Sequence, residues 1–264
     1  MKFAILFGFV FLAKSDLFAQ HSNCARLIDS MLQTSKATFS PDKTKEINSC
    51  IYEIQNEGFF LDEEKCKYDS SKIQIEKALS LWQHINDTAN QANLLKYLGY
   101  LNGRLGYFHL GKIQISKAIE LFTSKNMDYG VAVSWFDLAK VYEFENKIDS
   151  ALFFTTKALD YWKQKSNGKR IFGLNNYLIH LLAKGKKSKY IDTLIRKNSL
   201  YLLKEKIYWR EELDYYFTAF KLFEKTKEKE NKKRFLSLYL LKMSELKKET
   251  GQDKYSLFDE RNCR

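Results

Sequence analysis

Four cysteines, Cys24, Cys50, Cys66 and Cys263, are the residues of this sequence that could form covalent cross-links. They allow three pairings, and none lies in a CxxC pair, which argues against a thioredoxin-like redox site and against a zinc knuckle. Cys50 and Cys66 flank a turn that we expect near residues 58–61, and an antiparallel helical hairpin would bring them to similar heights. The sequence therefore predicts a disulfide between Cys50 and Cys66, with free buried thiols as the alternative.

The other residues able to do chemistry form no recognisable site. The four histidines are scattered and belong to no HExxH motif: His21, His84, His109 and His180. The acidic run Asp62-Glu63-Glu64 comes at an expected helix start, where carboxylates stabilise the helix dipole. No GxSxG, Walker-type GxxxxGK[ST] or strand-linked GxGxxG motif occurs. We therefore expect no catalytic residue, no metal site and no cofactor, and predict that the protein is not an enzyme.

The N-terminus has the pattern of a secretory signal peptide over residues 1–19. Lys2 is followed by the apolar run Phe3–Ala13, and the small residue Ala19 fits cleavage before Gln20. The run is shorter than the roughly 20 apolar residues that a membrane span needs, and an uncleaved anchor is the alternative. We expect an exported protein, periplasmic or secreted, without stable membrane insertion after cleavage.

The composition favours long helices, because one Pro and 11 Gly among 264 residues leave few helix breakers. The net charge of +12 is concentrated toward the C-terminus, where residues 163–264 hold 26 basic and 13 acidic residues. A solvated lysine-rich surface explains such an excess, and an anionic partner is the alternative. The aromatic and lysine residues between Tyr215 and Lys227 fit a helix that packs on two faces. Export also argues against a nucleic-acid target, so we predict no nucleic-acid partner.

A repeat organises the chain. The segment at residues 72–79 (KIQIEKAL) recurs at residues 112–119 (KIQISKAI) and, more weakly, at residues 152–159 (LFFTTKAL). The offset of 40 places one alanine of each copy in the same register: Ala78, Ala118 and Ala158. Periods of 20 to 50 residues indicate a solenoid or another repeat array.

These residues resemble the tetratricopeptide (TPR) family, in which a large residue, Leu, a small residue and Tyr mark the first helix of a hairpin and small residues mark the second. The copy that matches best consists of Trp135, Leu138, Ala139, Tyr142, Ala151 and Ala158. The resemblance implies an all-α, right-handed α-solenoid of about five antiparallel helical hairpins over residues 41–250. An N-terminal helix in residues 20–40 would precede the repeats, and a tail at residues 251–264 would follow them. The 40-residue period, against the family's 34, is similar to that of the extracytoplasmic TPR regions of bacterial sensor and regulator proteins.

Solenoids of this family expose a concave surface built from first helices, where proteins or peptides bind. The family's concave positions fall on Lys96, Tyr100, Arg104, Phe136, Lys140, Asn176, His180 and Lys184. This set is basic and aromatic, so an acidic segment of a partner would complement it. Of the family's Lys-and-Asn carboxylate clamp only Lys96 is matched, with Tyr100 where Asn is expected. We predict a non-catalytic protein- or peptide-binding scaffold, with a stand-alone sensor or signalling module acting on a membrane receptor or transcription regulator as the alternative.

Overall fold

The structure, a computed structural model, describes residues 24–33, 40–63, 67–185 and 190–250. A short helical segment at residues 24–33 precedes the labelled helices. These are α2 (Pro41–Glu63), α3 (Tyr68–His84), α4 (Thr88–Arg104), α5 (Phe108–Ser124), α6 (Asp128–Phe144), α7 (Ile148–Gln164), α8 (Gly168–Lys184), α9 (Ile191–Lys204), α10 (Trp209–Thr226) and α11 (Lys229–Thr250). The predicted all-α fold is confirmed. The predicted signal peptide at residues 1–19 and the tail at residues 251–264 lie outside the described residues.

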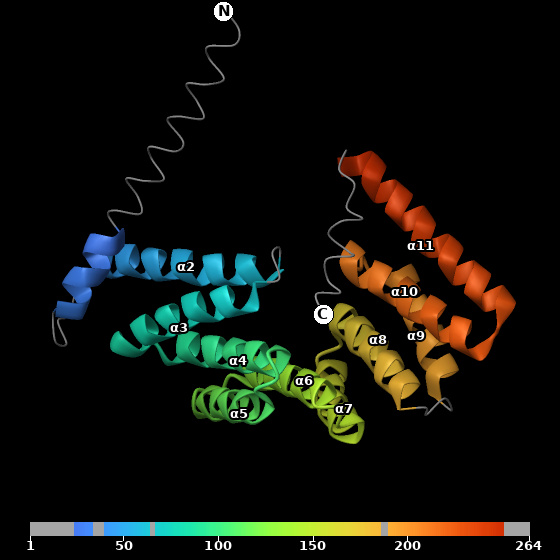
Figure 1. Cartoon of the computed structure of the whole chain (residues 1–264), viewed down its shortest axis with the longest axis horizontal. Coiled ribbons are helices and arrows are strands. Elements are labelled where there is room, and N and C mark those ends of the chain that lie inside the picture. The colour runs from blue at the N-terminus through green and yellow to red at the C-terminus, as the bar shows by residue number, and fades with distance from the viewer. Residues whose placement is uncertain (1–23, 34–39, 64–66, 186–189, 251–264) are drawn as a thin grey trace, which may run out of the picture.

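Successive helices pair as hairpins: α2 with α3, α4 with α5, α6 with α7, α8 with α9, and α10 with α11. Neighbouring hairpins also meet through their first helices, α4 against α6 and α8 against α10. The hairpins follow a curved row from α2 to α11, with α4, α6 and α8 on the inner side and α5, α7 and α9 on the outer side (Figure 1). The described part of the chain is thus a solenoid of five hairpins whose first helices build the concave face.

Six consecutive helices, α3 to α8, share one length and one spacing. Each is 17 residues long, and each begins 20 residues after the one before it. Three residues connect each helix to the next. In the connection between α3 and α4, the N–H of Asp87 donates to the carbonyl oxygen of Trp82 at 3.0 Å, which is the 6→1 bond of a Schellman motif. The middle residue of each three-residue turn has a positive φ: Asn86, Gly106, Asn126, Asn146 and Ser166. Because the turns are alike, the 40-residue sequence period consists of two structural halves of 20 residues.

The period places the same kinds of residue in the core of successive hairpins. The alanines that define the repeat are all fully buried, on α3, α5 and α7: Ala78, Ala118 and Ala158. Four positions later each of these helices carries an aromatic residue that is at most 5 % exposed: Trp82, Phe122 and Trp162. The small residues let the helices approach, and the aromatic rings fill the space between hairpins.

Helix α2 is longer than the sequence indicated. We expected a turn near residues 58–61, but α2 continues to Glu63. Gly58 lies where α2 crosses α3, because a Cβ atom there would sit 2.7 Å from Ile75 Cδ1 and 3.3 Å from the carbonyl oxygen of Ser71. This glycine therefore allows two helices to pack closely and does not end a helix.

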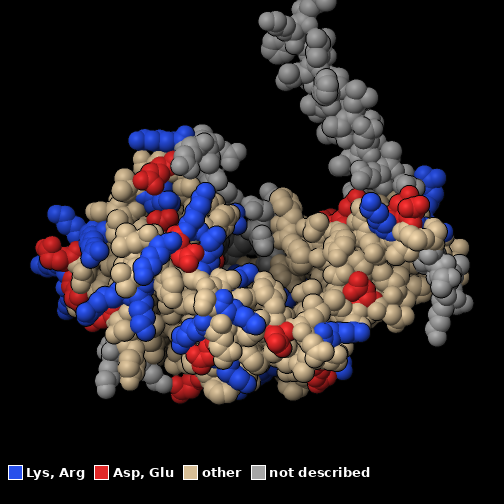
Figure 2. Space-filling view, turned by 180° about the vertical axis from the view of Figure 1, so that it is seen from behind, with Lys and Arg blue, Asp and Glu red and all other residues tan. Residues whose placement is uncertain are grey.

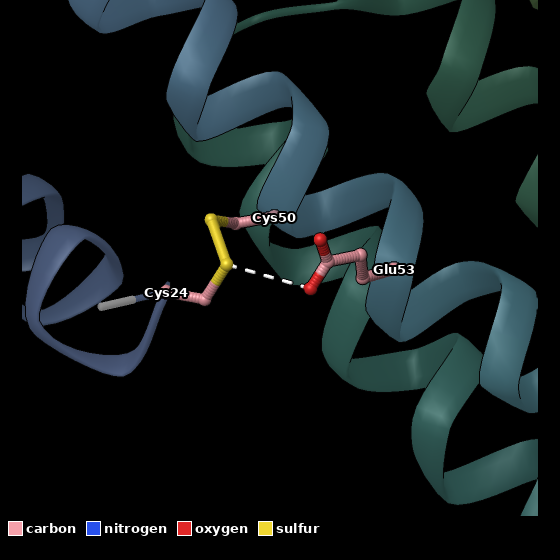
Figure 3. The surroundings of a disulfide bond; sticks show 3 residues. All are labelled: Cys24, Cys50 and Glu53. Atoms are coloured by element: carbon pink, nitrogen blue, oxygen red, sulfur yellow. Dashed lines mark hydrogen bonds between the residues drawn. A yellow bond between two sulfur atoms is a disulfide. The ribbon is translucent and has the colours of Figure 1, made fainter. Parts of the chain in front are cut away.

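The predicted disulfide between Cys50 and Cys66 is wrong. Cys50 is bonded instead to Cys24, with the two Sγ atoms 2.12 Å apart (Figure 3). The error follows from the end of α2, since a helix that runs to Glu63 has no turn at residues 58–61 to bring the residues on either side of it to similar heights. Cys66 itself lies outside the described residues.

The disulfide attaches the segment at residues 24–33 to the first hairpin. Ile28 and Met31 of this segment are buried in one cluster with Ile47 and Ile51 of α2. The carboxylate of Glu53 lies 3.5 Å from Cys24 Sγ (Figure 3), a sulfur that carries no proton while it is in the bridge. The segment thus covers the N-terminal end of the core with both apolar contacts and a covalent bond.

Candidate functional site

The eight residues predicted to bind a peptide all lie on first helices of the hairpins. Helix α4 carries Lys96, Tyr100 and Arg104, α6 carries Phe136 and Lys140, and α8 carries Asn176, His180 and Lys184. Because α4, α6 and α8 follow one another along the inner side of the curve (Figure 1), the set spans three neighbouring hairpins.

Aromatic and cationic contacts connect the middle of this set. The Lys140 ammonium lies 5.1 Å from the centroid of the Tyr100 ring and 4.5 Å from that of Phe136. Phe136 meets Tyr177 edge-on with 5.0 Å between ring centroids, and Tyr177 in turn stacks on His180 at 6.1 Å. Side chains from α4, α6 and α8 therefore form one continuous row.

Three of the predicted cations are engaged within the protein. Asp137, 9 % exposed on α6, lies 3.6 Å from the Lys96 ammonium and accepts a hydrogen bond from Lys140 at 3.2 Å. The Arg104 guanidinium lies over the ring of Tyr68 at 4.7 Å and donates to its hydroxyl. These contacts reduce the positive charge that the set could offer to an acidic ligand.

The carboxylate of Glu143 on α6 contacts three side chains of α8. Its Oε1 lies 2.7 Å from His180 Nε2 and accepts from Lys184 at 3.2 Å, and its Oε2 accepts from the Tyr177 hydroxyl at 2.7 Å. Burial acts to raise the pKa of Glu143, but the hydrogen bonds and charges of His180, Tyr177 and Lys184 together lower that pKa to about 2. Burial and the Glu143 charge also raise the pKa of the Tyr177 hydroxyl. The ionised carboxylate thus ties neighbouring hairpins together.

A groove of about 640 Å³ lies between the C-terminal halves of α8 and α10. Its polar and charged lining consists of His180, Lys184, Lys221, Lys225 and Thr218, and its apolar lining consists of Ala183, Phe217 and Leu222. Among the described residues no carboxylate lines this groove. Figure 2 shows that Lys and Arg gather on the side of the molecule built by the C-terminal helices. We call the groove between α8 and α10 the basic groove.

The predicted set did not include Lys221 and Lys225. Their signal was present in the sequence, because lysines four residues apart share one face of a helix and these two lie in the basic C-terminal part of the chain. The sequence predicts that the aromatic residues around them pack in the core, and Tyr215, Tyr216 and Phe223 are buried. The lysines, however, lie on the opposite, accessible side of α10.

A second cavity of about 440 Å³ adjoins the basic groove and shares His180 and Phe217 with it. Its apolar walls come mainly from α6 and α8 and include Val133, Phe136, Leu174 and Tyr177. Its polar lining includes Arg170, Asn176, Glu211 and Asp214. We call it the aromatic pocket. The concave face therefore offers two adjoining hollows of different charge.

The described ranges show no group of three or more His, Cys, Asp or Glu side chains that could hold a metal ion. In the same ranges no helix combines the length and the apolar character needed to cross a membrane.

Comparison with solved structures identifies the fold. BtubC (BKLC) from P. vanneervenii is similar with a TM-score of 0.66 and 11 % sequence identity, over 87 % of this chain and 92 % of that chain. The chain has a TPR-like repeat fold. Two crystal structures of the nearly identical TPR-like repeats of a Podosopora anserina putative kinesin light chain are also similar. The structure of a single-residue variant has a TM-score of 0.59, and the other structure has a TM-score of 0.57. Both are 6 % identical to this chain and cover 75 % and 74 % of it, and 96 % of each of those chains is matched. No family model and no curated protein sequence matches the chain.

TPR-like repeat folds are generally protein-binding scaffolds and typically non-catalytic. The likeness to these structures is one of fold, at identities too low to transfer a partner.

Proposed function

We propose that this protein is an exported, non-catalytic scaffold that binds an acidic segment of a partner protein along the concave face of its solenoid. The observation that carries the proposal is the basic groove, where one histidine and three lysines line a hollow between two first helices. Phe217 and Leu222 add apolar surface to the same hollow, so a ligand would gain hydrophobic contact as well as charge pairing.

Of the three groove lysines, Lys184 is held by Glu143, whereas Lys221 and Lys225 have weak partners or none among the described residues. Lys221 pairs with Glu224 at 3.2 Å, and these side chains are 52 % and 40 % exposed. Exposed pairs of this kind contribute about 0 to 1 kcal/mol each. Within the described ranges no residue pairs with the Lys225 ammonium. An acidic segment could therefore pair with Lys221 and Lys225 at little cost, while His180 and Lys184 keep their contacts with Glu143.

Export is supported by two independent features. The N-terminal sequence has the order of a signal peptide, a basic start followed by an apolar run and a small residue. The structure pairs Cys24 with Cys50, and disulfides persist chiefly outside the reducing cytosol. A fusion of residues 1–40 to alkaline phosphatase, which is active only after export, tests this part. Activity, with a mature N-terminus at Gln20, is expected; a cytosolic, inactive fusion would refute export.

Ligand selection tests the groove. The oxidised mature protein is used to select peptides from a random display library, and we expect enrichment of Asp and Glu. The double variant Lys221→Glu, Lys225→Glu should lose about tenfold or more in affinity for the selected peptides, because charge pairing turns into repulsion.

The matched control makes the same charge change on the outer side of the solenoid. Lys117 of α5 and Lys163 of α7 each form an exposed ion pair within their own helix, so Lys117→Glu, Lys163→Glu should leave affinity within about twofold. Circular dichroism checks that both variants are folded. Selected peptides without an acidic bias, or equal affinity for both double variants, would show that the basic groove is not the binding site.

A further inference from the structure

The aromatic pocket has walls that attract a cation. Four rings line it: Phe136, Trp162, Tyr177 and Phe217. The faces of such rings carry negative electrostatic potential and attract ammonium or guanidinium groups within about 6 Å. The cavity of about 440 Å³ also falls within the roughly 300 to 1,000 Å³ of pockets that hold small ligands or ligand side chains.

A carboxylate at the pocket has no partner of its own. Glu211, in the first turn of α10, is half-buried, and within the described ranges it forms no hydrogen bond or ion pair. Burial raises the pKa of Glu211, the charge of Asp214 raises it further, and the nearby Arg170 and Lys169 act to lower it. A carboxylate that has lost water without gaining a partner would be stabilised by a cation from outside.

The arginine that lines the same pocket is engaged by a hydroxyl and by one of the pocket's rings, not by Glu211. Arg170 donates from Nη2 to the Tyr129 hydroxyl at 3.1 Å, and its guanidinium lies 5.8 Å from the centroid of the Trp162 ring. The Arg170 charge is thus directed toward α6 and α7, and it forms no ion pair with Glu211.

We propose that the aromatic pocket receives a Lys or Arg side chain of the bound partner, with its cationic group beside Glu211 and its methylenes against the rings. This inference rests on the proposed function, because the segment that supplies the cation is the one that lies in the basic groove. His180 and Phe217 line both hollows, so one extended segment can reach both. The partner segment is therefore dipolar, with its acidic part toward Lys221 and Lys225 and its basic residue toward Glu211.

Two small probes of equal shape test the pocket directly. Nα-acetyl-L-arginine N-methylamide and the uncharged Nα-acetyl-L-citrulline N-methylamide are titrated into the oxidised mature protein, with two-dimensional NMR as the readout. We expect the arginine probe to bind about threefold to thirtyfold more tightly, as a cation beside aromatic rings would, with shifts at Trp162. In Glu211→Gln the two probes should bind alike. Glu224→Gln, which removes a carboxylate elsewhere on α10, should keep the preference.

The selected peptides give the second arm. Wild-type protein should enrich Lys or Arg at a fixed spacing from the acidic residues, and Glu211→Gln should lose that enrichment while it keeps the acidic bias. Equal binding of the two probes to wild-type protein, or a preference that persists in Glu211→Gln, overturns the pocket assignment. If peptides respond to the Lys221 and Lys225 substitutions but not to Glu211→Gln, the pocket inference fails and the proposed function stands. If the arginine probe binds but no peptide is selected, the cation pocket stands and the peptide-binding function fails.

Discussion

His180 Nε2 lies 2.7 Å from Glu143 Oε1, and this contact joins α8 to α6 across the boundary between two hairpins. A solenoid depends on such boundaries, because each hairpin is stabilised by its neighbours. The carboxylate is only 13 % exposed, so its charge is poorly screened by water and its state of ionisation affects the fold.

The first prediction concerns acid stability. The pKa of Glu143 is lowered from 4.5 to about 2, so its stabilising effect is fully present above about pH 4.5 and is lost as the pH falls toward 2. Glu143→Gln should therefore lower the free energy of unfolding at pH 7 by at most about 3 kcal/mol, and the difference should vanish near pH 2. Urea unfolding followed by tryptophan fluorescence measures this difference in the free energy of unfolding.

The control is Glu120→Gln, which removes an exposed ion pair and should lower the free energy of unfolding by less than about 1 kcal/mol. A gap between Glu143→Gln and wild type that is the same at both pH values would contradict the prediction.

The second prediction concerns the turns. Ser166 adopts a φ of 50°, a left-handed conformation that costs a residue with a Cβ atom about 1 to 2 kcal/mol. Ser166→Gly should raise the free energy of unfolding by about 0.5 to 1 kcal/mol, the strain relieved exceeding the extra freedom of the unfolded chain. Gly106 is the reverse case, because its φ is 87° and, apart from its two chain neighbours, no described residue has an atom within 4 Å of an added Cβ. Gly106→Ala should destabilise by a similar amount through backbone strain alone. Thermal unfolding of both variants checks the signs.

The third prediction separates a glycine that packs from one that does not. A Cβ atom on Gly111 would lie 2.5 Å from the carbonyl oxygen of Gly99, so α5 must move away from α4 to admit it. Gly111→Ala should destabilise by about 1 to 3 kcal/mol. Among the described residues, and apart from the backbone of its own helix, the only atom within 4 Å of a Cβ added at Gly173 is Glu211 Oε1, at 3.7 Å. Gly173→Ala should stabilise by about 0.5 to 1 kcal/mol, as alanine does inside a helix. The free energies of unfolding of the two variants, measured by chemical denaturation, test this prediction. Equal effects would show that α4 and α5 are farther apart at Gly111 than in the structure.

The fourth prediction concerns the disulfide. Non-reducing peptide mapping of the exported protein should recover Cys24 linked to Cys50, which are 26 residues apart. In the chain-entropy model a loop of this length stabilises the folded state by about 3 to 4 kcal/mol. Cys24→Ser should therefore speed amide hydrogen exchange in residues 24–33 and along α2, and leave α6 to α8 unchanged. Cys66→Ser is the control and should alter neither. Recovery of Cys50 linked to Cys66 would restore the pairing that the sequence alone indicated.

The repeat was predictable because it depends on local residue types. Buried alanines 40 residues apart and the large residues beside them required no knowledge of distant contacts. The finer 20-residue period was also present in the sequence, because Asn or Gly occupies four of its five turn positions. It is difficult to recognise because first and second helices bury different faces and so differ in residue pattern. The first and second helices share a length without sharing a pattern.

The disulfide and the charge of the site were not predictable in this way. Gly58 looks the same in sequence whether it ends a helix or admits a neighbour, and only the position of Ile75 decides. Likewise, Lys96 and Lys140 appear available until Asp137 is seen between them. Both features depend on contacts between helices, which the pattern of one helix does not contain.

The uniform spacing of α3 to α8 restricts how this chain can change in length. A 20-residue deletion, one helix with its turn, would keep every turn intact but would move each following helix from the inner side of the curve to the outer side. The basic groove and the aromatic pocket would then face away from the concavity. A 40-residue deletion or insertion leaves inner helices inner, and it changes only how far the groove stands from the disulfide-bound end, by about 10 Å per hairpin. Related chains should therefore differ by whole hairpins, so that the solenoid acts as a spacer whose length is set in fixed steps.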